Sequence, residues 1–191
     1  MKTRMQAQHV QSIQPVAPRT DEVFIRAVVL PISCVISYWL ITHIIPHAYS
    51  ISRDDNLVGG MWAVVATIFV YRYSHAESVM AALSRMTATA VSFALCLVYL
   101  LILPFHLWGM AALIGIAAIV VTLMGRPDDT ITTEITIAVV MVVAALSPHN
   151  AWRQPILRMI DTAVGVAVGV AAAWTGANAA RLTKLMGSTR N

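Results

Sequence analysis

The chain has 191 residues, of which 58% are hydrophobic and only 12% are charged, whereas about a quarter of the residues in a soluble domain are charged. Its mean hydropathy of +0.72 indicates more apolar surface than one water-soluble core can bury. These values exclude a large soluble catalytic domain and indicate a membrane protein with enough apolar residues for five or six spans. The formal charge of +4 is scattered between apolar segments, as membrane topology requires, and does not indicate a nucleic-acid partner.

Polar residues at both ends delimit a membrane domain. Residues 1–22 are predicted to be a cytoplasmic tail, because they contain no apolar stretch typical of a signal peptide. Residues 23–177 are predicted to form a six-span membrane transporter domain, and residues 178–191 a second cytoplasmic tail. The predicted fold class is an all-α membrane protein with six transmembrane helices.

Six apolar segments supply these predicted spans, and turn residues separate them. The motif Ser74-His75-Ala76-Glu77 is typical of a capping box and marks the start of a long third helix. The predicted spans run from Ala27 to Ile45, where Pro46 ends the helix, from Leu57 to Tyr71, from His75 to Leu103, from Trp108 to Met124, from Thr130 to Leu146 and from Pro155 to Ala177.

The distribution of Lys and Arg predicts the orientation of these spans. With the N-terminus inside, ten of the 13 basic residues fall on the inner side, and only Arg53, Arg153 and Arg158 fall on the outer side. Basic residues favour the cytoplasmic side of a multi-span protein. We therefore predict a multi-pass protein of the inner (plasma) membrane whose N- and C-termini are both cytoplasmic.

An internal repeat relates the third helix to the sixth. At an offset of 73 residues, five of the seven residues from Arg85 to Val91 coincide with those from Arg158 to Val164. Each half then holds three spans, an odd number, so the second half is inverted relative to the first. This predicts a 3+3 inverted repeat, and transporters built in this way place their substrate site where the repeats meet.

Arg158 and Arg85 are the candidate substrate-binding residues. Arg158 stands near the start of its helix on the outer side, where the helix N-terminus already favours an anion. The alternative is that Arg158 reaches the lipid headgroups and pairs with Asp161 three residues on. Arg85 is expected to begin its helix at the inner face, which topology alone would explain; its candidacy rests on the repeat.

Other polar and small residues each allow two interpretations of their role. Glu134 lies about one turn inside an apolar span. If it faces a wet cavity, it is a candidate for proton coupling, as is Asp161. The alternative is that Glu134 reaches water at the inner surface. His43 and His47 have the spacing of a metal pair, but Pro46 between them argues against a helix, and no metal site is predicted. Gly165 and Gly169 are suited to close helix packing, within the chain or at a dimer interface.

Three motifs carry a resemblance to a known family. Gly60-Met61-Trp62-Ala63 opens a short span, Arg85-x-x-x-Thr89 lies on the next helix, and Arg158-x-x-Asp161-Thr162-x-x-Gly165 lies on the last. With these motifs the chain resembles, over roughly Val58 to Ala177, the fusaric-acid-resistance-like (FUSC) or aromatic acid exporter family of membrane transporters, which is related to plant aluminium-activated malate channels.

The resemblance implies a six-span module that moves organic anions, with Arg85 and Arg158 as anion contacts. It also implies assembly with further copies of the chain and, as a partner, a periplasmic adaptor. The chain departs from the family pattern in two respects. Ala88 and Ser92 stand where the family usually has glycines, and a large cytoplasmic region typical of the family is not found in this sequence.

Two hypotheses of function follow. The first is an exporter or channel in the lipid bilayer for small organic anions such as aromatic carboxylates, in which arginines lower the cost of dehydrating the anion. The alternative is a non-transporting membrane scaffold or accessory subunit of a larger efflux assembly, whose arginines only set topology. Enzymatic motifs and cofactor-binding motifs are not found, so neither an enzyme nor a cofactor is predicted.

Overall fold

The computed structural model describes residues 20–44, 52–72, 74–146, 148 and 151–188, and the regular structure in these ranges is entirely helical. The all-α fold predicted from the sequence is therefore confirmed. The helices are α2 (Thr20–Trp39) with its π-helical extension η1 (Leu40–Ile44), α3 (Arg53–Val70), α4 (His75–Ile102), α5 (Leu107–Leu123), the 3-10 turn η3 (Pro127–Asp129), α6 (Thr130–Leu146) and α7 (Arg153–Ser188).

The helices are those of a multi-pass membrane protein. Four described segments are long and apolar enough to cross a bilayer, namely Val23–Ile44, His75–Ile102, Pro127–Leu146 and Arg153–Ala179. The apolar helix α5 has 17 residues, slightly fewer than a typical span. Helix α3 has 18 residues and begins with three charged ones. That all six helices cross the membrane therefore stays a prediction.

Several helix boundaries differ from the predicted ones at polar ends. Helix α3 begins at Arg53 instead of Leu57, because the Ser52 hydroxyl accepts a hydrogen bond from the backbone N–H of Asp55 (3.1 Å) and caps the charged first turn. Helix α2 begins at Thr20, inside the predicted tail, and α7 continues to Ser188, well past the predicted end at Ala177. Hydropathy marks the apolar part of a helix and not its polar ends, which are helical here too. The predicted end of the first span, at Ile45 and Pro46, lies outside the described residues.

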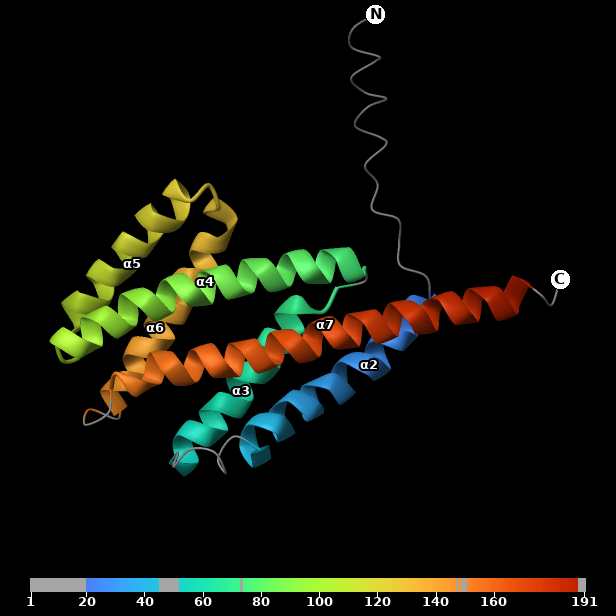
Figure 1. Cartoon of the computed structure of the whole chain (residues 1–191), viewed down its shortest axis with the longest axis horizontal. Helices are drawn as coiled ribbons and strands as arrows, with labels where there is room; N and C mark the ends of the chain where they lie inside the picture. Colours follow the sequence, from blue (N-terminus) through green and yellow to red (C-terminus); the bar gives the residue numbers. More distant parts are fainter. Residues whose placement is uncertain (1–19, 45–51, 73, 147, 149–150, 189–191) are drawn as a thin grey trace, which may run out of the picture.

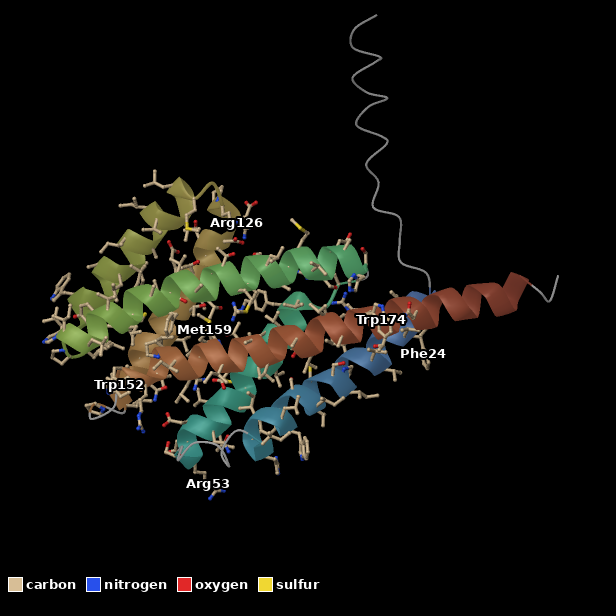
Figure 2. All side chains as sticks on the ribbon, in the orientation of Figure 1. Phe24, Arg53, Arg126, Trp152, Met159 and Trp174 are labelled. Atoms are coloured by element: carbon tan, nitrogen blue, oxygen red, sulfur yellow. The ribbon has the colours of Figure 1, made fainter. Side chains whose placement is uncertain are left out.

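Helices α4 and α7 form the centre of the bundle (Figure 1), where they lie side by side and run in opposite directions. Helices α2 and α3 pack against α7 on one side, and α5 and α6 pack against α4 on the other. Helix α2 begins and α7 ends at the same end of the bundle. The two central helices each carry one of the two candidate arginines, so the fold places both arginines on its central pair.

Close contact between α3 and α7 depends on small residues. A Cβ atom added to Gly165 would lie 2.3 Å from the backbone oxygen of Ala63, and one added to Gly169 would lie 3.0 Å from that of Thr67. The Thr67 hydroxyl donates both to Ala63 in its own helix (2.9 Å) and to the backbone oxygen of Gly165 (3.0 Å). The structure thus places the two glycines at a helix interface within the chain.

Candidate functional site

Arg85 lies deep inside the bundle. It is the eleventh residue of α4, so about 15 Å of helix separates it from the helix start, and the side chain is only 4% exposed. The expectation that Arg85 begins its helix at the inner face is therefore wrong. The helix does begin at His75, as the predicted span does, so Arg85 lies ten residues beyond its start.

Two aromatic rings of α3 enclose the Arg85 guanidinium. Its Cζ atom lies 5.3 Å from the ring centre of Trp62 and 5.0 Å from that of Phe69. The two rings are seven residues apart and therefore share one face of α3. Trp62 is buried, whereas Phe69 is 46% exposed.

The Arg85 charge has no counter-ion among the residues that the structure describes. Its Nε and Nη2 atoms are buried without a hydrogen-bond partner. Each desolvated cation–π contact contributes up to about 2 kcal/mol, while an unpaired buried charge costs several kcal/mol and each unmade hydrogen bond adds about 1–3 kcal/mol. The aromatic rings alone therefore do not offset the cost of burying the Arg85 charge.

A hydrogen bond connects this aromatic pair to α7. The indole N–H of Trp62 donates to the Thr162 hydroxyl at 3.1 Å, and both side chains are buried. Because Thr162 directly follows Asp161, the indole ring links the surroundings of Arg85 to those of the second arginine. The position of Trp62, and with it one wall of the Arg85 site, thus depends on how α3 and α7 pack.

Arg158 is buried as well, but it has a counter-ion. Its Nη1 atom lies 3.0 Å from Oδ2 of Asp161, one turn along α7, and the two residues are 1% and 4% exposed. The predicted pairing with Asp161 is present, whereas the expected reach to the headgroups is wrong, because the guanidinium is enclosed by protein. The contact is a charge pair without hydrogen-bond geometry, because Nε, Nη1 and Nη2 of Arg158 and Oδ2 of Asp161 form no hydrogen bond with the described residues.

Helix α3 completes the surroundings of this ion pair. Gly59 faces Asp161, and an added Cβ atom there would lie 2.9 Å from a carboxylate oxygen, so a larger residue would require the carboxylate to shift. One turn before Arg158, Gln154 donates to the Asp55 carboxylate at 2.7 Å. Asp55 therefore adds a second negative charge close to Arg158.

The remaining candidates lie away from the two arginines or are described only in part. Glu134 is half-buried on α6, and residues within the described ranges form neither a hydrogen bond nor an ion pair with it. His43 stacks on Trp39 with 5.6 Å between ring centres, and His47 lies outside the described residues. The structure therefore tests neither the proton-coupling role of Glu134 nor the spacing of the two histidines.

A second polar cluster fastens the turn between α5 and α6 to α4, and we call it the α4–α6 clasp. The buried Asp129 carboxylate accepts a hydrogen bond from Ser84 and pairs with Arg126 at 3.3 Å, and Arg126 also donates to Thr87 at 3.1 Å. Because every charge in the clasp is paired, it requires no ligand.

Sequence reasoning found both arginines but missed the groups that distinguish them. Trp62 was noticed only as part of a family motif, and Phe69 was not noticed at all, although their spacing of seven residues was a detectable signal. Gly59, Asp55 and Gln154 fell at a predicted helix end or outside the predicted spans. At Arg85 the neighbours come from another helix of the same half, and at Arg158 side chains from both halves of the chain meet. Periodicity within one segment cannot show either arrangement.

Comparison with known families agrees with the helical, membrane-embedded architecture. The family model described as fusaric acid resistance protein-like (FUSC) matches residues 33–172, most of the chain. The chain belongs to the FUSC family. The resemblance seen in the sequence is confirmed, and the match extends it from Val58 back into α2. No curated protein and no solved structure matches the chain. Membership of the FUSC family indicates a role in membrane transport.

Proposed function

We propose that this FUSC protein is an exporter or channel for small organic anions such as aromatic carboxylates. We place it in the inner membrane with six spans and with both termini in the cytoplasm. The observation that carries the proposal is the buried Arg85 guanidinium, which has aromatic neighbours and no carboxylate partner in the described chain. A buried cation of this kind is costly in a bilayer and is a functional feature by default.

The chemistry of the Arg85 site fits a carboxylate. A guanidinium offers a planar fork of N–H donors that matches both oxygens of a carboxylate, and such charge-assisted bonds are about twice as strong as neutral ones. A carboxylate at Arg85 would supply the acceptors that Nε and Nη2 lack. The rings of Trp62 and Phe69 would in addition offer flat apolar surfaces to an aromatic substrate.

The proposed inverted repeat is in keeping with a transporter. At the same offset of 73 residues, Arg53-Asp54-Asp55-Asn56 aligns with Arg126-Pro127-Asp128-Asp129, so each half has an arginine followed by acidic residues at the start of its middle helix. The packing of the helices has the same correspondence. In each half the middle helix packs on the last helix of the other half, α3 on α7 and α6 on α4. In inverted-repeat transporters the substrate binds where the halves meet, and Arg85 lies on the central helix pair.

Flux measurements test this proposal. Purified protein is reconstituted into liposomes, and uptake of radiolabelled benzoate is compared between wild type and Arg85→Gln. We expect at least a tenfold loss of flux, because the substituted site offers no charge to the anion. Arg72→Gln is the matched control: it removes the same charge from an exposed side chain and should leave flux unchanged.

Two results would argue against the proposal. Equal benzoate flux in wild type and Arg85→Gln, with both proteins folded, would remove Arg85 from the pathway. A wild-type protein that moves neither benzoate nor other organic anions would favour the scaffold hypothesis instead. Coupling to protons through Glu134 is a separate proposal, tested by asking whether a proton gradient accelerates wild-type flux but not that of Glu134→Gln.

A further inference from the structure

The two buried arginines occupy equivalent positions in the proposed repeat but have different neighbours. Arg85 and Arg158 align at the offset of 73 residues, yet the residue three positions further on is Ala88 in the first case and Asp161 in the second. Ala88 is fully buried and carries no charge. The first half therefore lacks the carboxylate with which the second half neutralises its arginine.

The aromatic rings show the opposite asymmetry. The offset aligns Trp62 with Ile135 and Phe69 with Val142, so the repeat provides no aromatic counterparts in the second half. Aromatic faces attract a guanidinium without occupying its N–H groups, whereas a carboxylate competes for them. One arginine is thus left free to bind an acceptor, and the other is already neutralised.

We propose, building on the proposed function, that the protein has a single anion-binding site at Arg85, and that Asp161 is a built-in counter-ion that closes the equivalent site at Arg158. An anion arriving at Arg158 would have to displace Asp161 at 3.0 Å and leave a buried carboxylate unpaired. The Asp55 carboxylate held by Gln154 opposes it further. An anion arriving at Arg85 displaces no carboxylate of the residues that the structure describes.

Binding of radiolabelled benzoate to the detergent-solubilised full chain, measured by scintillation proximity, tests this assignment. We expect one benzoate per wild-type chain and at least tenfold weaker binding by Arg85→Gln. Removing the counter-ion should open the second site, so Asp161→Asn should bind two benzoates, and Arg85→Gln/Asp161→Asn should regain one. Ala88→Asp places a carboxylate three residues after Arg85 and should weaken binding at least tenfold.

Variants that remain folded are identified by thermal unfolding. If Asp161→Asn is too unstable for a binding assay, benzoate should still raise its unfolding temperature more than that of wild type, because the anion replaces the lost counter-ion. Two benzoates per wild-type chain, or unchanged binding by Arg85→Gln, would overturn the single-site assignment. Wild-type protein that neither binds nor transports benzoate or related anions would instead refute the proposed function.

Discussion

The close approach of α3 and α7 at Gly165 makes a quantitative prediction about stability. A methyl group added there in Gly165→Ala would lie 2.3 Å from the Ala63 oxygen and 2.8 Å from the Ala66 Cβ atom. The first contact is about 1 Å shorter than an ordinary carbon–oxygen contact, and backbone cannot rotate out of the way as a flexible side chain would. The two helices must move apart, and such overpacking costs about 1–3 kcal/mol.

Glycine-to-alanine substitutions at two other positions provide controls for the stability effect. Gly115 on α5 is exposed, and an added Cβ atom would have no atom within 4 Å, so Gly115→Ala should be neutral or stabilising by up to about 1 kcal/mol, since alanine favours a helix. Gly169→Ala is intermediate, with its nearest contact at 3.0 Å. We expect the unfolding temperatures to rank Gly165→Ala lowest, then Gly169→Ala, then Gly115→Ala.

Thermal unfolding in detergent, followed by tryptophan fluorescence, measures this ranking. A cost of 1–3 kcal/mol corresponds to a decrease of roughly 2–12 °C for a chain of this size, on the scale of soluble proteins. A Gly165→Ala protein as stable as Gly115→Ala would refute the inferred contact.

Since the same helix pair holds the Trp62–Thr162 hydrogen bond, Gly165→Ala should also weaken benzoate binding at Arg85.

Two further predictions follow from other contacts, and a third follows from the proposed orientation in the membrane. Asp129→Ala breaks the α4–α6 clasp and should lower stability by about 1–3 kcal/mol, whereas exposed Asp128→Ala should have little effect in the same unfolding assay. Thr67→Val removes the hydrogen bond to α7 and should cost about 1 kcal/mol, more than Thr175→Val, whose hydroxyl bonds only within its own helix. The third prediction uses a chain whose two native cysteines are replaced by alanine. His106→Cys should react with an impermeant maleimide added outside intact cells, whereas Asp128→Cys should react only after permeabilisation. The reverse pattern would show that the proposed orientation is inverted.

The sequence by itself determined the features that depend on local composition and spacing. Apolar runs predicted the helices, and the C-terminal ends of α4 and α6 lie within one residue of the predicted ends. The pairing of Arg158 with Asp161 was also predictable, because residues three apart on a helix are neighbours whatever surrounds them. The polar ends of α2, α3 and α7 were missed, because capping and helix propensity, rather than hydropathy, set those boundaries.

Only the tertiary structure decided how the surroundings of the two arginines differ. Arg85 lies between Trp62 and Phe69 because α3 packs beside α4, and Asp161 is accommodated because Gly59 faces it across the interface of α3 and α7. Such contacts depend on how far one helix is shifted and rotated against another, and the packing of the whole bundle sets both. The spacing of residues along a single helix therefore identifies the two arginines and the Arg158–Asp161 pair, while the neighbouring helices place aromatic rings at Arg85, which has no counter-ion among the described residues.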